Sequence, residues 1–278
     1  AILVGSHAGA MPRASLDVPP TQSEVAWKSL PMQALGHRAT LLARAPDGAF
    51  FGGLARPNGE SERLEVFQID PPSPVSLGEI ACATGALSAA AVAIKDKVVI
   101  ATSTGEEGES CATTATPGSP NGLRVIALDR AGGREMLYEA WYADPVVDVA
   151  AVEVEDDIWL ARDSGGAASV IRVGADGVVA QPITVGKQTR GAIALARRGA
   201  AVAAAFVARD SGGETFIGVV ELDPDGAVKE LGRLATQDAP WLRDLELVAD
   251  PSSGSLIVAY VGRIGANERA FAWRLGCP

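Results

Sequence analysis

The sequence has few aromatic residues, two histidines and three cysteines, and it contains no long apolar run. Aromatic residues make up 5% of its 278 residues. No apolar stretch approaches the roughly 20 residues that a membrane-spanning helix needs, so we expect no transmembrane segment. The 24 Lys and Arg residues are outnumbered by 34 Asp and Glu, which gives a net charge of −10 without any basic stripe. Nucleic acid is therefore excluded as a partner, because phosphate binding requires clustered Lys and Arg.

The familiar catalytic signatures are also missing. There is no Gly-x-Ser-x-Gly elbow, no Walker A loop, no His-Glu-x-x-His motif and no EF-hand loop. A Ser-His-Asp triad would have to use His37, since His7 falls in an extended leader, and an exposed loop histidine is the simpler interpretation of His37. The cysteines lack the paired spacing of a zinc site. We therefore predict no cofactor and no metal.

What the chain has in abundance is glycine, proline and internal repetition. It contains 31 Gly and 17 Pro, so turns are frequent. The segment Ala-Arg-Asp-Ser-Gly-Gly at 161–166 recurs 47 residues later at 208–213, and a weaker copy begins at Ala55. Each Asp-Ser-Gly-Gly turn offers one Asp, which is too few ligands for calcium, so we interpret these segments as hairpin turns. A short apolar strand follows each copy.

Each repeat divides into four strands by its alternation and its turn residues. In the fourth repeat these are Ala192–Ala196, Ala201–Ala208, Phe216–Leu222 and Val228–Leu234. The first strand of each repeat consists of small apolar residues, as expected beside the crowded central axis. The last strand alternates apolar with charged residues, as expected for an outer strand with one face in water. Two Ala-rich runs, Leu87–Ile94 and Ala200–Phe206, could be mistaken for helices, but each stands where the repeat requires a strand.

A period near 50 residues with four strands per repeat is typical of β-propeller blades. Over roughly residues 23–278 the chain resembles a five-bladed β-propeller of four-stranded antiparallel blades. Repeats begin near Thr40, Leu87, Val146, Gly191 and Leu242, and the last one ends after its third strand. We expect the N-terminal strand Val25–Leu30 to complete that last blade and close the ring, which would remove the open edges. An oligomer or an open array of sandwiches is the rival architecture.

The predicted domain organisation is a Pro-rich, extended N-terminal tether at 1–22 followed by a single propeller domain at 23–278. A polar insertion at 105–121 lies in the second blade, and long loops on rigid scaffolds often carry function. Cys111 lies in this insertion, and a disulfide between Cys111 and Cys82 would hold the insertion in place. Cys277 would then be unpaired. The alternative is that the cysteines are free thiols. A disulfide would place the protein outside the cytoplasm, in the periplasm, at the cell surface or secreted. The leader is of a kind usual for exported or membrane-tethered bacterial proteins.

The best candidate site is the ring of residues at the starts of the inner strands. Its polar members are Arg38, Ser88, Asp148, Arg190 and Asp244, and Trp241 is the tryptophan that we expect to touch a ligand. Some five-bladed propellers are glycoside-processing enzymes with carboxylates around the axis, so the resemblance suggests Asp148 and Asp244 as an acid and base or nucleophile pair. The simpler interpretation is that Asp and Arg at strand starts hold the blades together.

The absence of a catalytic constellation favours a non-enzymatic binding or scaffold propeller. Such a protein would be an accessory subunit or a surface module with one or more protein partners. The first alternative is a carbohydrate-active enzyme that uses Asp148 and Asp244. The second is a lectin, which should repeat similar sugar pockets in several blades, and the divergence between the repeats speaks against it.

Overall fold

The computed structural model describes 14 segments of the chain: 2–4, 12–15, 27–29, 38–44, 50–58, 60–68, 75–95, 97–106, 118–129, 131–174, 179–236, 242–250, 252–264 and 267–276. Every regular element in these segments is a β-strand. The described residues contain no helix that is long and apolar enough to cross a membrane. The all-β prediction is therefore confirmed.

Five antiparallel sheets follow one another along the chain, and in each of them neighbouring strands are consecutive in sequence. The first sheet consists of β4 (Arg38–Arg44), β5 (Phe50–Asn58), β6 (Ser61–Gln68) and β7 (Val75–Thr84). The second consists of β8 (Ala89–Ile94), β9 (Lys97–Thr104), β10 (Gly122–Leu128) and β11 (Arg134–Trp141). The third consists of β12 (Asp148–Val154), β13 (Asp157–Asp163), β14 (Ala167–Val173) and β15 (Ile183–Lys187).

The fourth sheet consists of β16 (Thr189–Arg198), β17 (Ala201–Arg209), β18 (Thr215–Leu222) and β19 (Val228–Ala235). The fifth has three strands, β20 (Leu242–Ala249), β21 (Leu256–Ile264) and β22 (Asn267–Leu275). A separate three-stranded sheet precedes them, made of β1 (Ile2–Val4), β2 (Pro12–Ser15) and β3 (Trp27–Ser29).

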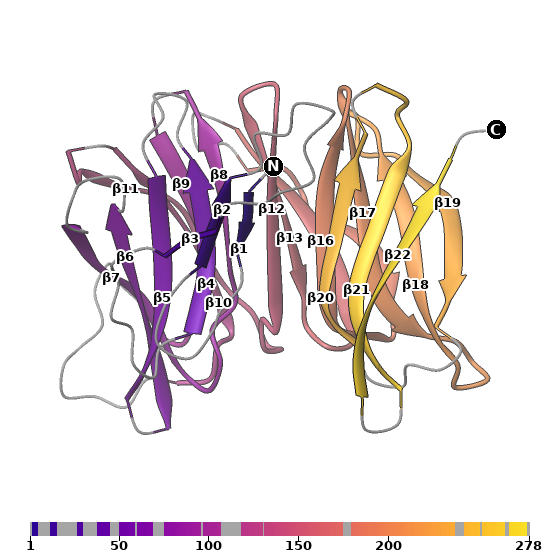
Figure 1. Cartoon of the computed structure of the whole chain (residues 1–278), viewed down its shortest axis with the longest axis horizontal. Helices are drawn as coiled ribbons and strands as arrows, with labels where there is room; N and C mark the ends of the chain where they lie inside the picture. Colours follow the sequence, from indigo (N-terminus) through magenta and orange to yellow (C-terminus); the bar gives the residue numbers. More distant parts are fainter. Residues whose placement is uncertain are drawn as a thin grey trace.

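The first strands of the five sheets line up around the centre of the molecule. β4 packs against β8, β8 against β12, β12 against β16, and β16 against β20. Figure 1 shows the first two sheets overlapping on the left, the third at the centre, and the fourth and fifth overlapping on the right. The starts of these inner strands and the hairpins between the second and third strands lie at one end of the molecule, which we call the insertion end because the described ends of the insertion, 105–106 and 118–121, lie there.

The hydrophobic core is divided into four layers, one between each pair of neighbouring sheets. Strand β10 is apolar except for Arg124: Val125 packs toward the third sheet, Ile126 packs toward the first, and the strand is buried along its whole length. A strand covered on both faces favours apolar residues on both of them rather than at alternate positions. Outer strands such as β19 keep one face open and mix in charge.

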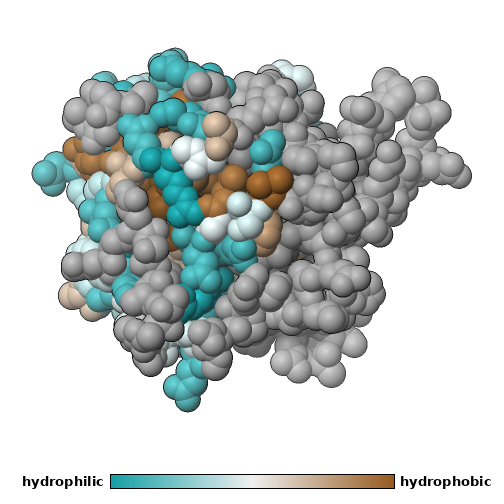
Figure 2. All heavy atoms as spheres, turned by 90° about the vertical axis from the view of Figure 1, so that its left-hand side faces the viewer, coloured by the Kyte–Doolittle hydropathy of each residue, from teal (hydrophilic) through white to brown (hydrophobic). Residues whose placement is uncertain are grey.

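The strands that the repeats predicted are confirmed. The fourth repeat was divided into four strands, and these correspond to β16–β19. Both Ala-rich runs form strands rather than helices: β8 covers all but the first two residues of Leu87–Ile94, and β17 covers all but the first residue of Ala200–Phe206. From the side of the first two sheets, the described surface is largely hydrophilic with apolar residues between the polar ones (Figure 2).

The predicted completion of the last blade by the N-terminal strand is wrong. Backbone pairing joins Trp27–Ser29 to β2, with Pro12 opposite Ser29, and the fifth sheet keeps three strands. Pairing with a strand a dozen residues upstream closes a much shorter loop than pairing with the other end of the chain, and the entropic cost of closure rises with loop length. The described residues show no closure of the ring.

Candidate functional site

Asp148 begins the innermost strand of the third sheet and joins three sheets. Its Oδ1 accepts a hydrogen bond of 2.8 Å from the hydroxyl of Ser88, which precedes β8, and one of 3.0 Å from its own neighbour Val149 N. Its Oδ2 accepts a hydrogen bond of 2.9 Å from Ile193 N in β16. Both carboxylate oxygens are thus engaged by groups of the fold itself.

A bulge in β16 explains why carboxylates are needed at this point. The register of β16 against β17 shifts between Thr189 and Ile193, so the N–H groups of the intervening residues lose their ladder partners. Buried N–H groups require an acceptor. The backbone N–H groups of Gly191 and Ala192, inside the bulge, stabilise the charge of Asp163, and Asp148, directly opposite Asp163 on β12, accepts from Ile193 N at the end of the bulge. Asp163 is fully buried, and its Oδ1 accepts 2.6 Å hydrogen bonds from Thr189 Oγ1 and from Gly165 N.

The electrostatics of this pair follow from its burial. Burial raises the pKa of Asp148, against the hydrogen bonds from Ile193, Ser88 and Val149, and the nearby Asp163 raises it further. Burial likewise raises the pKa of Asp163, although the Thr189 hydroxyl and the backbone N–H of Gly165 favour its ionised form. Both acids therefore hold their protons more strongly than free carboxylic acids do.

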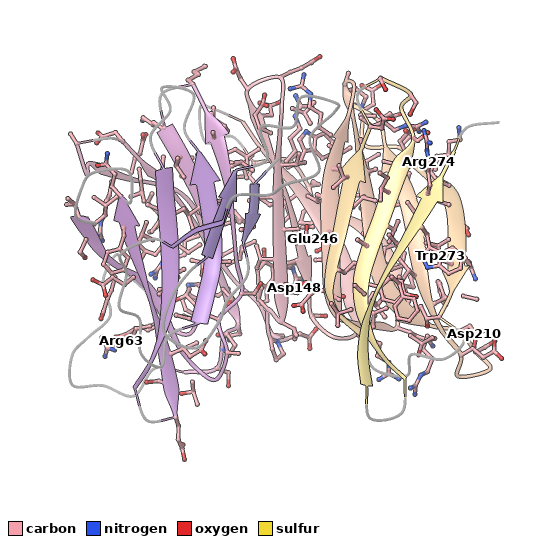
Figure 3. All side chains as sticks on the ribbon, viewed as in Figure 1. Arg63, Asp148, Asp210, Glu246, Trp273 and Arg274 are labelled. Carbon is pink, nitrogen blue, oxygen red and sulfur yellow. The ribbon has the colours of Figure 1, made fainter. Side chains whose placement is uncertain are left out.

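A third acid, Glu246, projects from β20 toward the same central region. Figure 3 shows Glu246 and Asp148 one above the other between the two halves of the molecule. Burial raises the pKa of Glu246 first, and the negative charges of Asp148 and Asp244 raise it further. More than a third of the Glu246 surface still faces solvent, so its carboxyl group remains accessible. Glu246 could not be recognised from the sequence as a site residue, because it lies inside the strand rather than near its start, where the candidate ring was predicted.

The remaining predicted site residues do not form one cluster in the described part of the chain. Asp244 is exposed and has a left-handed backbone, φ 52°, at a bulge near the start of β20. Arg190 is exposed and forms no ion pair with a described residue. The backbone of Arg38 begins β4, but its side chain, like Trp241 and His37, lies outside the described residues.

Arg162 is an unusual cation at the same end of the molecule. Its guanidinium carbon lies 3.7 Å from the centroid of the Tyr142 ring. Its Nε and Nη1 are buried without a hydrogen-bond acceptor, and so is the hydroxyl oxygen of Ser169, which stands opposite Arg162 on β14. A buried guanidinium without a carboxylate is costly unless something neutralises it. In the sequence Arg162 stands out only as part of the recurring Ala-Arg-Asp-Ser-Gly-Gly segment.

Two exposed apolar side chains lie at the two ends of the connection between β11 and β12: Trp141 ends β11 and precedes Tyr142, and Val147 N donates to Asp163 O, the residue after Arg162. Trp141 is 37% exposed and Val147 is 46% exposed. The same connection is tied to the C-terminal end of the insertion, because Tyr142 N donates to Asn121 O at 3.0 Å and Asn121 Nδ2 donates to Tyr142 O at 3.2 Å. Together Trp141, Val147, Arg162 and Tyr142 make a surface at the base of the insertion, which we call the insertion-base surface.

Both ends of the insertion are fixed to the end of β7. Gly105 N donates to Cys82 O at 2.6 Å, and Thr84 N donates to Gly118 O at 2.8 Å. Cys82 is disulfide-bonded. The other two cysteines, Cys111 and Cys277, lie outside the described residues.

The Asp-Ser-Gly-Gly turns are stabilised by their own aspartates. Asp210 Oδ1 accepts a 2.9 Å hydrogen bond from Glu214 N, four residues on. Asp163 accepts from Gly165 N, as described above. No group of three or more candidate metal-ligating side chains occurs among the described residues.

No family model matches the chain, and no curated protein sequence matches it. Three solved structures resemble it over most of its length. YjhT superposes with a TM-score of 0.55 at 11% identity, covering 96% of this chain and 88% of that one. Hydrazine synthase of Kuenenia stuttgartiensis gives 0.53 at 13% identity, covering 91% and 70%. TolB from Acinetobacter baumannii gives 0.51 at 14% identity, covering 96% of this chain and 59% of that one.

At these identities the likeness shows the fold alone. The consecutive antiparallel sheets and the structural similarity agree on a β-propeller, as the repeats predicted.

Proposed function

We propose that this protein is a five-bladed, non-enzymatic binding propeller whose insertion-base surface receives a protein partner. The observation that carries the proposal is the saturation of Asp148. A glycoside-cleaving pair requires two carboxyl groups that are free to meet substrate. Asp148 instead uses both oxygens to join the second, third and fourth sheets.

The insertion-base surface has the properties of a partner site. Trp141 and Val147 offer exposed apolar area, and Arg162 offers a cation whose charge the fold leaves uncompensated. Aromatic residues and arginine are the side chains that most often dominate protein interfaces. A partner that presents an acidic side chain to Arg162 among apolar contacts would complement this surface. TolB is similar to this chain in fold only, so the similarity identifies no residue of the insertion-base surface.

An extracytoplasmic location fits the disulfide. Disulfides persist in the periplasm, at cell surfaces and in secreted proteins, and are rare in the cytosol. Because both ends of the insertion are hydrogen-bonded beside Cys82, we assign Cys111 as its partner. In this proposal residues 1–22 are the tether and 23–278 the propeller domain, and the disulfide holds the insertion against the rim where the partner binds.

The test compares capture of one partner by matched surface variants. The tagged wild-type protein is used to isolate a partner from the extracytoplasmic fraction of its source, and the purified partner is titrated against Val147→Lys and Val228→Lys. Val228 is a suitable control because it is 43% exposed but begins β19, at the other end of the molecule. Loss of affinity in Val147→Lys alone supports the proposal. Equal affinities of the two variants would contradict it.

The enzyme and lectin alternatives are tested with the wild-type protein. Hydrolysis of any member of a glycan panel, abolished by Glu246→Gln or Asp244→Asn, would replace the binding proposal with an enzyme. Binding on a glycan array would favour a lectin. The proposal predicts that the protein neither hydrolyses nor retains glycans.

A further inference from the structure

A cavity of about 240 Å³ lies between the third and fourth sheets, away from the insertion-base surface. Phe206 and Phe216 contribute aromatic surface to it, Val185 and Val220 contribute aliphatic surface, and Lys187, Glu230 and Arg233 add charge. We call it the Phe216 cavity. Its walls come from outer strand β15 of one sheet and from β17, β18 and β19 of the next.

Two bulges, one in each outer strand, create this space. The register of β14 against β15 shifts beside Val185, and the register of β18 against β19 shifts beside Leu231. In a regular strand residues three apart point to opposite faces. The second bulge brings Glu230 and Arg233 onto one face, where Arg233 Nε donates to Glu230 Oε1 at 2.9 Å. Bulges that re-aim side chains occur preferentially next to functional sites.

Two glycines set the shape of the cavity wall. A Cβ at Gly186 would lie 2.7 Å from the Phe206 ring, and one at Gly218 would lie 2.6 Å from it. Only glycine allows the backbones of β15 and β18 to approach the ring from both sides. The Phe206 ring occupies the space that side chains at both positions would take, and it lines the cavity beside the two glycines.

The charge at the mouth is positive in a chain that is strongly negative overall. Arg233 lies over the Phe216 ring at 4.9 Å and is paired with Glu230. Lys187 ends β15, is exposed, and has no ion pair with the described residues. One cationic charge is therefore left over at this mouth, although the chain carries a net charge of −10.

A second cavity provides the contrast. It measures about 120 Å³ and lies between the second and third sheets, with Lys95, Lys97 and Glu135 among its lining residues. Lys97 Nζ lies 2.6 Å from Glu135 Oε2, and Lys95 Nζ lies 3.5 Å from Asp156 Oδ2. Both lysines there have a carboxylate partner within the fold, and the space is half as large.

We infer that the Phe216 cavity binds a compact apolar molecule that carries one carboxylate, independently of the partner proposed above. An apolar cavity of roughly 150 Å³ accommodates a benzene ring, so this cavity has room for a ring with a short side chain. The ring lies against Phe206 and Phe216, and the carboxylate meets Lys187 at the mouth. A carboxylate is favoured because its charge neutralises the unpaired lysine.

The experiment titrates 3-phenylpropanoate into the full chain and follows backbone amide chemical shifts. The expected result is saturable binding that shifts the amides of Gly186 and Gly218. The uncharged 3-phenylpropanol should bind at least about tenfold more weakly, which corresponds to about 1.4 kcal/mol. Equal affinities for the acid and the alcohol would overturn the assignment of the carboxylate.

Variants then locate the site. Lys187→Met should weaken 3-phenylpropanoate binding about tenfold without changing binding of the alcohol, whereas the matched control Lys97→Met should leave both unchanged. Phe216→Ala should weaken both ligands, and its fold is checked by the amide spectrum. Saturable binding that survives Lys187→Met and Phe216→Ala, or shifts confined to another sheet, would overturn the proposal, as would the absence of binding by wild type.

Discussion

Arg124 and Arg162 belong to neighbouring sheets, yet the fold treats the two cations differently. Arg124 is 1% exposed and has an acceptor for every nitrogen of its guanidinium: it pairs with Glu139 at 2.7 Å and donates to the carbonyl oxygens of Ile80 and Glu106. Arg162 has an aromatic ring on one face and two buried nitrogens without acceptors. The first cation holds the molecule together, whereas the described residues give the second no carboxylate.

The same difference separates two acids at the centre. Asp148 accepts hydrogen bonds on both of its carboxylate oxygens and is structural. Glu246 keeps exposed surface and is held near other negative charges. Saturation of a charged group by the fold is thus the physical criterion that distinguishes structural residues from candidates for binding.

The largest effect on stability should come from removing Arg124, the buried cation whose guanidinium nitrogens all have acceptors. Arg124→Met leaves Glu139 without its partner and two carbonyl groups without a donor, so the free energy of unfolding should fall by about 3–5 kcal/mol. Thermal unfolding followed by circular dichroism measures the loss. A loss below about 1 kcal/mol would show that the Arg124 network is dispensable. The contrast between Arg124 and Arg162 would then no longer hold.

The next effect concerns the carboxylate that joins three sheets. Asp148→Ala leaves Ile193 N and the Ser88 hydroxyl without an acceptor, so stability should fall by about 2–3 kcal/mol. Arg190→Ala, at an exposed position near the start of the next inner strand, serves as the control and should change stability by less than about 0.5 kcal/mol. Chemical denaturation of both variants is the measurement, and equal losses would show that position at the inner rim, rather than saturation, determines the cost.

A smaller effect on stability is expected for the unsatisfied cation. Arg162→Met removes a buried charge that has no carboxylate, so the protein should be as stable as wild type or more stable by up to about 1 kcal/mol. Affinity for the partner, measured by calorimetry, should nevertheless fall about tenfold or more, because interfacial arginines often dominate binding. Unchanged affinity would remove Arg162 from the insertion-base surface.

The smallest effect is a change in pH dependence at Glu246. Its pKa is raised in the folded protein, so the folded state binds more protons than the unfolded state between the two pKa values. Its contribution to stability is therefore fully present below the unfolded pKa, about 4.3, and is lost as pH rises through the folded value. The stability of Glu246→Gln should fall less over that range than that of wild type. If the stabilities of wild type and Glu246→Gln changed equally with pH, the raised pKa of Glu246 would be contradicted.

Much of the fold could be predicted from the sequence, because repeated turns and strand-length apolar runs reflect local preferences. Ala201–Arg209 could be assigned to a strand despite its alanines, since the repeat fixed its place. The strand that pairs with Trp27–Ser29 could not be predicted. Its pairing depends on whether the nearby strand β2 or the distant open edge of the fifth sheet binds it.

The candidate site was predicted in part. Asp148 was identified at a strand start, and the simpler interpretation, that such residues hold the blades together, describes its contacts, although its partners are a hydroxyl and backbone N–H groups rather than arginines. The roles of Asp163 and Arg162 depend on a bulge in β16 and on the contact with Tyr142 across two sheets. Neither feature leaves a pattern in the sequence, because each arises from residues far apart along the chain.

The most direct test places Arg124→Met and Arg162→Met side by side in urea denaturation with a common wild-type reference. We predict that the midpoint falls sharply for Arg124→Met and stays level or rises for Arg162→Met, with equal slopes in all three proteins. Comparable decreases in both midpoints would mean that Arg162 is as much a part of the fold as Arg124, which would contradict its assignment to a binding surface.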